Sequence, residues 1–275
     1  MAIKDILVFL SDGDTNGARE QVAIDMATRH GARLTGAALA SLRPRHAPDE
    51  GRKANARMGD RMARRLVESF NERAAEAGIV STTVMIKGDG PTSAMKFAHY
   101  ARNADLVILA QPNPAYTSFA RLQELAQTVL LHSGRPVFFM PYIGVKRIAC
   151  DRALIAWDGT PAASRVVHDA VPLLAAGREA IILVVESPKQ KAVKQDVLVE
   201  GLQAHLERHG VNTLIRRVSP GSSSVPAVIL NQISENDIDY MVMGGYGTPT
   251  LMQKVFGSVS QSLLSSMVVP IVMSH

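Results

Sequence analysis

The sequence predicts an α/β protein built from two similar halves, each with a parallel sheet flanked by helices. Short apolar runs of strand length alternate with longer stretches whose apolar residues recur at helical spacing over the 275 residues. This alternation is typical of parallel strands joined by crossover helices. The order of elements then repeats, which indicates two copies of one architecture.

The first half is expected to contain five strands and four helices. Thr15 can cap the first helix, and Gly31 and Gly78 stand where the first two helices end. The expected strands are residues 3–10, 32–39, 79–86, 105–110 and 136–140. The expected helices are residues 16–30, a long helix that ends at 77, and residues 91–103 and 118–132.

The second half repeats this order. Its first strand ends in Asp158-Gly159-Thr160, and Pro161 stands at the first helical position, which proline favours. The expected strands are residues 152–157, 180–185, 211–218, 238–243 and 269–273. The expected helices are residues 161–176, 189–209 and 223–235, with a last helix beginning near residue 257.

The repeat can be tested by the spacing of acidic residues. Asp105 corresponds to Asp239 at an offset of 134, and Asp12 corresponds to Asp158 at an offset of 146. The difference of 12 residues predicts an insertion in the first half, which we place around residues 43–55. We therefore expect two domains, whose bounds are residues 1–143 and 147–275.

Composition bounds the protein class. Hydrophobic residues make up 47% of the chain, enough for a sizeable core, and charged residues make up 20%. The lone Cys150 excludes an intrachain disulfide and a cysteine-rich zinc site. No apolar run approaches a membrane span, and the first residues lack the layout of a signal peptide. A cytoplasmic protein with no membrane span is expected.

Positive charge is concentrated in the first half. The formal net charge is +5, and most of the excess lies in the basic segment 43–65. This segment is either a patch for nucleic acid or an acidic partner, or a solvated helix face, which the interspersed Asp60 and Glu68 favour. No aromatic residue is interleaved there, so nucleic acid is not the expected partner.

The most distinctive motif is the glycine-rich stretch 243–260. Gly244 and Gly247 follow an expected strand, and Gly257 and Ser258 stand where the last helix begins. Free N–H groups and the helix dipole attract phosphate oxygens at such a place, and glycine lets a ligand approach the backbone. Ser258 adds a hydroxyl group and can cap the helix. Spacing alone also fits a loop without a ligand.

The first half lacks these residues. At the offset of 134, the four positions hold Ala110, Asn113, Gln123 and Glu124. A carboxylate at the last of them would repel a phosphate group. We therefore predict one anion site per chain, in the second half, and explain its glycines by a ligand.

These residues resemble a known family. The spacing Gly244-x2-Gly247-x9-Gly257-Ser258 is similar to the Gly-x2-Gly-x9-Gly-Ser/Thr signature of the ATP-binding universal stress proteins. The strand end Asp158-Gly159 and the Val-Pro-Ile-Val run at 269–272 match the same family. The resemblance covers the whole chain as a tandem pair, strong in the second half and degenerate in the first.

This resemblance implies a fold and an arrangement. Each domain would be Rossmann-like, similar to the adenine nucleotide α hydrolases, with a five-stranded parallel sheet. The final strands, 137–140 and 269–273, would pair the two domains as an intrachain pseudo-dimer. A homodimer is a further alternative.

The resemblance also implies an ATP site in the second domain, with or without Mg. Asp158 would face the ribose and adenine, and the backbone of Val185 would bond the adenine. The implied site consists of Ala156, Trp157, Asp158, Val185, Met243, Gly244, Gly247, Gly257, Ser258, Val259 and Ser260. Tyr246 stands where family members often have a basic or imidazole residue. Lys254 is either a partner of the γ-phosphate or a solvated lysine.

The sequence contains no convincing catalytic set. It lacks a Gly-x4-Gly-Lys-Ser/Thr phosphate loop, a Ser-Gly-Gly-x-Asp-Ser loop and a His-x-Gly-His motif. His205 and His209 are either a metal pair or, as the missing third ligand favours, a solvated helix end. Asp12 is either a relic of a site or a helix cap. We expect no catalytic residue and no metal site.

Three functions remain open. The favoured one is a stress-response regulatory protein that binds ATP, has at most slow hydrolysis and signals to an unknown protein partner, because no general base can be named. The second is a true nucleotide hydrolase or adenylyl-transferring enzyme. The third is an interaction module that binds no nucleotide.

Overall fold

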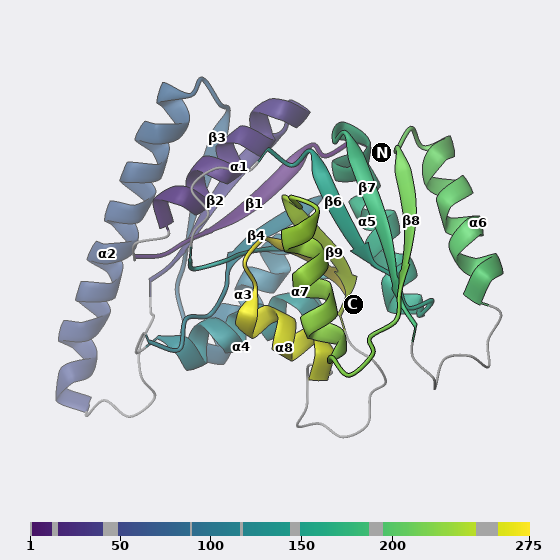
Figure 1. Ribbon diagram of the computed structural model, residues 1–275. Helices are drawn as coiled ribbons and strands as arrows, with labels where there is room; N and C mark the ends of the chain where they lie inside the picture. Colours follow the sequence, from purple (N-terminus) through teal and green to yellow (C-terminus); the bar gives the residue numbers. More distant parts are fainter. Residues whose placement is uncertain are drawn as a thin grey trace. The chain divides into compact units, whose positions relative to one another are not determined.

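The computed structural model describes residues 2–12, 16–40, 49–88, 90–115, 118–143, 149–186, 195–245 and 258–275. The chain divides into two compact units, Ala2–Arg147 and Ile148–His275 (Figure 1). Each unit holds one five-stranded parallel sheet with helices packed on it, so the expected fold class is confirmed. The expected pairing of the two final strands concerns how the units sit together, and it stays a prediction.

In the first unit the sheet has the strand order β3-β2-β1-β4-β5, all parallel. Its strands are β1 (Asp5–Leu10), β2 (Arg33–Leu39), β3 (Ser81–Ile86), β4 (Leu106–Ala110) and β5 (Val137–Met140). Its helices are α1 (Asn16–His30), α2 (Asp49–Glu76), α3 (Gly90–Ala101) and α4 (Phe119–His132). Helices α1 and α2 pack on β1 and β2, whereas α3 and α4 pack against each other.

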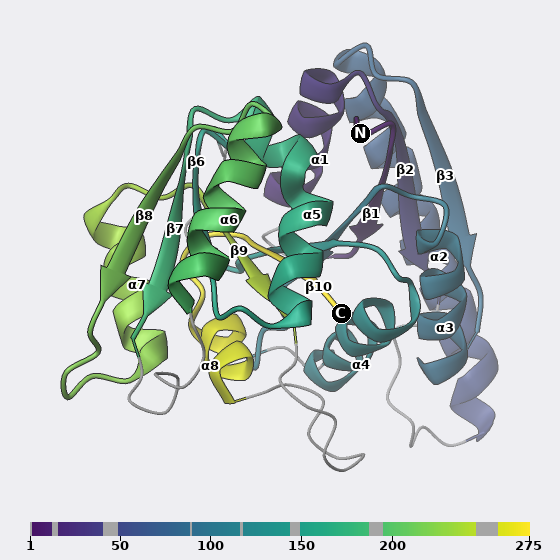
Figure 2. The same ribbon diagram turned by 90° about the vertical axis from the view of Figure 1, so that its right-hand side faces the viewer.

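In the second unit the order is β10-β9-β6-β7-β8, again all parallel. Its strands are β6 (Arg152–Ala156), β7 (Glu179–Val185), β8 (Thr213–Val218), β9 (Tyr240–Gly244) and β10 (Ile271–Ser274). Its helices are α5 (Pro161–Ala176), α6 (Gln195–Arg208), α7 (Val225–Glu235) and α8 (Ser258–Ser266). Helices α7 and α8 contact each other, and α5 and α6 lie together on the sheet (Figure 2).

All ten strands begin and end within two residues of the expected bounds. The central strands are buried on both faces, as crossover helices require of a parallel sheet, which is why their sequences are continuous apolar runs. At β2 the helix packing is unusually close. A Cβ atom on Gly36 would lie 2.7 Å from the ring of Phe70 in α2, so the missing side chain makes room for that ring.

The insertion lies between β2 and β3. Leu34 pairs with Ser81, 47 positions further on, whereas Ala180 pairs with Thr213, only 33 positions further on. The connection from β2 to β3 is therefore 14 residues longer than the connection from β7 to β8. The expected position around residues 43–55 falls in this segment, and residues 41–48 lie outside the described part. The additional length goes largely into α2, which has 28 residues against 14 in α6.

The register of the first strand corrects one expectation. Ile6 pairs with Leu106 and Ala153 pairs with Tyr240, and the second members of these pairs are 134 positions apart. The first members are 147 apart, so the offset of 146 used for Asp12 was wrong by one. Ser11, and not Asp12, corresponds to Asp158. The Asp-Gly dipeptides at residues 12 and 158 are identical in sequence but not equivalent in position. Between its first two strands the first unit has one more residue than the second unit has between β6 and β7.

Candidate functional site

The strand order reverses at the same place in both units, between β1 and β4 and between β6 and β9. In open α/β sheets ligands bind beyond the carboxyl ends of the strands at such a point. In the second unit the structure brings the ends of β6 and β9 together there. Ala156 pairs with Met243, and the next residues along the two strands are Trp157 and Gly244.

The neighbouring strand β7 completes this edge. The Trp157 backbone N–H donates to the Leu183 carbonyl oxygen at 2.9 Å, two residues before Val185, which ends β7. Trp157 and Val185 are half-buried, and Asp158 is exposed. Five of the predicted site residues (Ala156, Trp157, Asp158, Met243 and Gly244) thus lie at the ends of two paired strands, and Val185 lies at the end of the next.

Asp158 is held in place by the start of α5. Its Oδ1 atom accepts hydrogen bonds from the Thr160 backbone N–H at 3.0 Å and from Thr160 Oγ1 at 2.7 Å. Thr160 Oγ1 in turn accepts from the Ala163 N–H at 3.2 Å, which caps the helix. Gly159 has a φ of +74°, a value that glycine adopts without strain. Among the described residues, none bonds Asp158 Oδ2.

Close packing between β9 and α5 favours a glycine at position 244. A Cβ atom there would lie 2.7 Å from the Ala163 nitrogen and 2.9 Å from the Ala162 carbonyl carbon, both in the first turn of α5. Any side chain would push the helix start away from the strand end. A ligand is therefore not needed to explain Gly244, because the close approach of α5 in this unit gives a second reason for a glycine there.

The last strand is tied to the same helix. The Gly245 N–H donates to the Ser274 carbonyl oxygen at 3.0 Å, and Ser274 Oγ donates to Asp169 Oδ2 in α5 at 2.7 Å. Ser274 is 2% exposed. No sequence signal predicts this contact, because an isolated serine in an apolar strand belongs to no motif.

The remaining predicted residues belong to the last helix and the loop before it. Ser258 is the first residue of α8, as expected, Val259 is half-buried and Ser260 is buried. Gly247 and Gly257, with Tyr246 and Lys254, lie outside the described residues.

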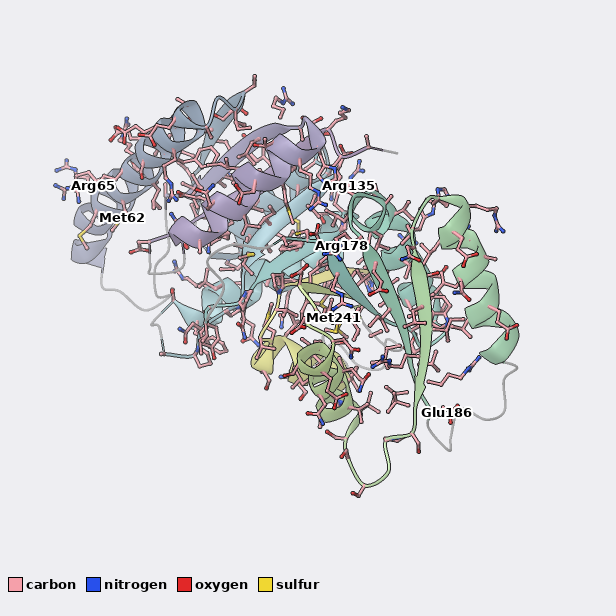
Figure 3. All side chains as sticks on the ribbon, turned by 45° about the horizontal axis from the view of Figure 1, so that its top comes forward. Met62, Arg65, Arg135, Arg178, Glu186 and Met241 are labelled. Carbon is pink, nitrogen blue, oxygen red and sulfur yellow. The ribbon has the colours of Figure 1, made fainter. Side chains whose placement is uncertain are left out.

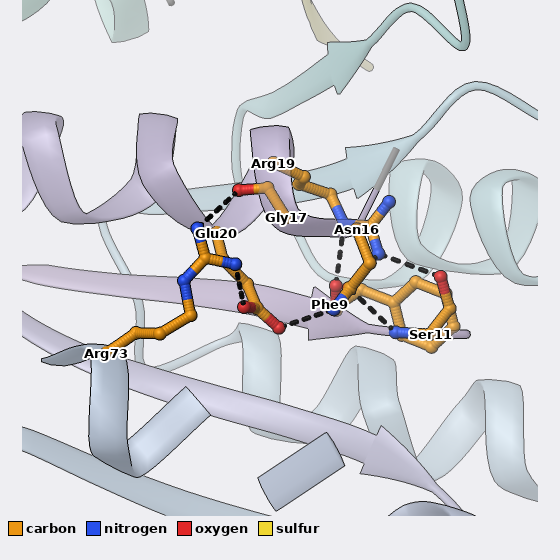
Figure 4. Close-up of polar contacts among 7 residues, drawn as sticks. All are labelled: Phe9, Ser11, Asn16, Gly17, Arg19, Glu20 and Arg73. Atoms are coloured by element: carbon orange, nitrogen blue, oxygen red, sulfur yellow. Dashed lines mark hydrogen bonds and ion pairs between the residues drawn. The ribbon is translucent and has the colours of Figure 1, made fainter. Parts of the chain in front are cut away.

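In the first unit, the residue that corresponds to Asp158 belongs to a cluster of polar side chains (Figure 4). Arg19 of α1 is 1% exposed and donates from Nε to the Phe9 carbonyl oxygen at 2.8 Å. Its Nη2 donates to Ser11 Oγ at 2.8 Å and to Asn16 Oδ1 at 2.7 Å. Burial lowers the pKa of Arg19 to about 10, and the charge of Glu20 opposes this shift. Ser11, the counterpart of Asp158, is thus bonded to a buried guanidinium group.

Glu20 and Arg73 extend this cluster to α2. Glu20 is 1% exposed and accepts from Asn16 Nδ2 at 2.5 Å and from Arg73 Nη1 at 3.1 Å. Arg73 Nη2 donates to the Gly17 carbonyl oxygen at 3.1 Å. Burial raises the pKa of Glu20, while the bond from Asn16 and the charges of Arg73 and Arg19 act in the other direction. We call Ser11, Asn16, Arg19, Glu20 and Arg73 the Arg19 cluster.

The second unit has apolar residues at the positions of α5 that correspond to Arg19 and Glu20 in α1. At the offset of 147, six of the seven buried positions of α1 fall on buried positions of α5. Arg19 and Glu20 then fall on Val166 and Val167. One signal for the cluster was present in the sequence: Arg19 lies on the apolar stripe of α1, four residues before the buried Ala23.

His205 and His209 lie together at the end of α6, with ring centroids 4.7 Å apart. Burial is the first cause that lowers the pKa of His205, followed by the charges of His209, Arg208 and His168. Within the described ranges, no group of three or more histidine, cysteine or acidic side chains is placed to hold a metal ion. Nor does any described helix have the length and apolar character to cross a membrane.

Comparison with known proteins agrees with this architecture. The chain is similar to a universal stress protein from Archaeoglobus fulgidus DSM 4304 (TM-score 0.72, 17% identity), with 98% of this chain and 95% of that chain covered. It is also similar to a putative universal stress protein from Pseudomonas aeruginosa UCBPP-PA14 (TM-score 0.60, 13% identity), with 99% and 93% covered. At these identities the likeness shows the fold. No curated protein matches the sequence.

The sequence itself matches one family over the second half. The model of the universal stress protein family matches residues 150–275, which contain the ends of β6 and β9 and the whole of α8. Residues 150–275 therefore form a universal stress protein family domain.

Proposed function

We propose that the second unit binds ATP, with or without Mg, at the carboxyl ends of β6 and β9, and that the protein acts as a nucleotide-dependent regulator in a stress response. The observation that carries this proposal is the Oδ2 atom of Asp158, to which no described residue bonds, beside Trp157 at the point where the strand order reverses. An exposed carboxylate oxygen there suits the hydroxyl groups of a ribose. The family match at residues 150–275 supports the resemblance to the ATP-binding universal stress proteins, from which the choice of ATP comes.

The remaining contacts follow from the residue types. The half-buried Trp157 offers an aromatic surface next to Asp158, and the end of β7 at Val185 offers backbone groups to an adenine ring. The start of α8 at Ser258 would receive the phosphates, because the first N–H groups of a helix attract anions. Gly247 and Gly257 would let the phosphates approach the backbone. Mg would be carried in by the phosphates.

We infer that the first unit is a diverged copy of the same domain that binds no nucleotide. Its five strands have the same order as those of the second unit. At the equivalent strand end, however, the Arg19 cluster replaces an exposed carboxylate by Ser11 bonded to a buried cation. A single ATP per chain is therefore expected.

Regulation is favoured over catalysis because the described carboxylates near this edge do not form a catalytic set. Asp158 Oδ1 serves the start of α5, Asp169 Oδ2 accepts from Ser274, and Glu186 is exposed just after the end of β7. We therefore name no general base among them. The output would pass to a protein partner through the conformation of the unit.

Isothermal titration calorimetry of the full chain with ATP tests the proposal. We expect one site per chain, loss of binding in Gly257→Val, and unchanged binding in the matched control Gln123→Val. Two sites, or equal effects of both substitutions, would contradict the one-site proposal. Rapid release of ADP or AMP would instead identify a hydrolase or an adenylyl-transferring enzyme, and no nucleotide binding would indicate an interaction module.

A further inference from the structure

Helix α2 is longer than the sheet it covers. Its 28 residues span about 42 Å, whereas the seven residues of β2 span about 23 Å. Among the α2 side chains that the structure describes, from Arg57 on, the first buried one is Ala63, followed by Phe70 and Ala74, all at most 1% exposed. The first half of the helix therefore runs past the end of its sheet (Figure 1). This segment lies in the crossover that holds the 14 additional residues, and it has no counterpart in the described residues of α6, Gln195–Arg208.

The exposed side of this segment combines apolar and positive side chains. Met58 is 60% exposed and Met62 is 37% exposed, one turn apart on the helix. Met62 and Arg65 point away from the body of the unit (Figure 3). Arginines line the outward side next to the methionines, and all are exposed: Arg57, Arg61, Arg64 and Arg65. We call these six residues the α2 face.

The charges of the α2 face are not used within the described part of the chain. No ion pair or side-chain hydrogen bond among the described residues involves its four arginines. The nearby acidic Asp60 lies 3.8 Å from Lys87 instead. Arg64 and Arg65 precede Glu68 by four and three residues, which is the less stabilising order, whereas Asp60 precedes Arg64 by four, which is the more stabilising one. One such acid among four arginines leaves the segment positively charged, so pairs within the helix do not account for the arrangement.

We infer that the α2 face docks an acidic amphipathic segment of a protein partner. Carboxylates of that segment would pair with the arginines, which form strong bidentate contacts with them. Its apolar side chains would cover Met58 and Met62, because unbranched thioether side chains adapt to many partner shapes. The inference is independent of ATP binding, since it concerns the first unit.

The methionines argue against two other partners. A nucleic acid backbone would engage the arginines and leave two thioethers against water. A membrane surface needs a wide apolar face, whereas the described α2 face offers two apolar side chains beside four charges. The opposite side of α2, from Ala63 to Ala74, is packed on the sheet, so the helix cannot turn to present more apolar surface.

The test uses the full chain and a panel of labelled helical peptides rich in glutamate, with leucine pairs four residues apart in stepped register. Fluorescence anisotropy should detect binding that weakens as salt is raised. We expect Met58→Ser with Met62→Ser to weaken it by about fivefold and Arg61→Gln with Arg65→Gln by about tenfold. Substitution of the two arginines should also make the binding of the peptides less dependent on salt concentration.

Matched controls separate docking from general surface effects. Leu214→Ser removes another exposed apolar side chain, and Arg208→Gln another exposed arginine, both in the second unit. These variants should bind the peptides as the wild type does, and circular dichroism melts should show all variants folded. The inference is overturned by the absence of peptide binding, by equal effects in the controls, or by tighter α2-dependent binding to single-stranded DNA or to phosphatidylserine vesicles.

Discussion

Asp105 and Asp239 make the same three hydrogen bonds in the two units. Asp105 Oδ2 accepts from the backbone N–H groups of Lys4 and Asp5 at 2.8 and 3.0 Å, and the Asp105 N–H donates to the Asp5 carbonyl oxygen at 2.7 Å. Asp239 repeats this at Asp151 and Arg152, with distances of 2.8, 2.9 and 2.9 Å. One carboxylate thus holds the start of the first strand in each sheet.

Replacing either aspartate should destabilise its own unit. In Asp105→Asn or Asp239→Asn a neutral oxygen replaces a charged acceptor of two N–H groups, which should cost about 1–3 kcal/mol of unfolding free energy. Hydrogen exchange of amides in β1 and β6 would assign each loss to a unit. Loss of protection in both units from one substitution would contradict the prediction.

The Arg19 cluster should behave as a coupled pair. Arg19→Val removes the donor to the Phe9 carbonyl oxygen, Ser11 Oγ and Asn16 Oδ1, and Glu20 keeps Arg73 but loses the favourable charge of Arg19. The loss of this buried charged member should cost about 3–5 kcal/mol. Arg19→Val with Glu20→Val, the residues at the matching positions of α5, should cost less than the sum of the two single substitutions. Urea unfolding of the three variants measures the coupling, and additive losses would show that the two residues act independently.

Glu20 should also give the first unit a specific pH dependence. Burial raises its pKa above the usual value of 4.5, so the folded state binds this proton more tightly than the unfolded state. The resulting stabilisation is fully present below pH 4.5 and is lost as the pH rises through the raised pKa. The wild type should therefore lose stability relative to Glu20→Gln over this interval.

Urea unfolding at stepped pH would show this trend as a sloping difference between the two proteins. The exposed Glu72→Gln in α2 is the matched control. A difference between wild type and Glu20→Gln that does not change with pH would refute the prediction.

Gly244→Ala should destabilise the second unit without any ligand. The new methyl group would meet the backbone of Ala162 and Ala163 below 3.0 Å, so the start of α5 must move, at a cost of about 1–3 kcal/mol. Ala110→Gly at the matching position of β4 is the control and should cost less than that. Thermal unfolding in nucleotide-free buffer decides the matter, and an unchanged melting temperature for Gly244→Ala would show that α5 adapts freely.

Trp157 should report ATP binding. It is the only tryptophan in the chain and adjoins Asp158 at the proposed site, so a bound adenine should quench its fluorescence. A titration monitored at the tryptophan emission should give the same dissociation constant as calorimetry. If calorimetry shows binding while the emission stays constant, the nucleotide lies elsewhere.

The strands and the fold class were predictable because parallel strands buried on both faces require continuous apolar runs. The Asp105 and Asp239 offset was predictable as well, since both residues perform the same task. The first strand was aligned one residue out of register, because the Asp-Gly pairs at residues 12 and 158 match as letters. Register depends on which residues pair across the sheet, and two identical dipeptides in the sequence do not show this pairing.

Features of the site that depend on neighbouring residues in the sequence were predictable, and features that depend on tertiary packing were not. Thr160 and Pro161 predict the start of α5, and the structure has a capped helix there. The reason for Gly244 was hidden, since it depends on how closely α5 approaches β9. The Arg19 cluster was hidden too, because its partners come from residues 11 to 73 and meet only in the folded unit.

The Arg19 cluster has a consequence for how the two halves would respond to metabolism. If the first unit binds no nucleotide, as proposed, its stability should be the same at every concentration of ATP in the cell. A unit that binds ATP as proposed gains stability by mass action, about 2.7 kcal/mol at a concentration one hundred times the dissociation constant. Starvation, which lowers ATP, would then expose the second unit to proteases first, while the stability of the first unit in the same chain would not change.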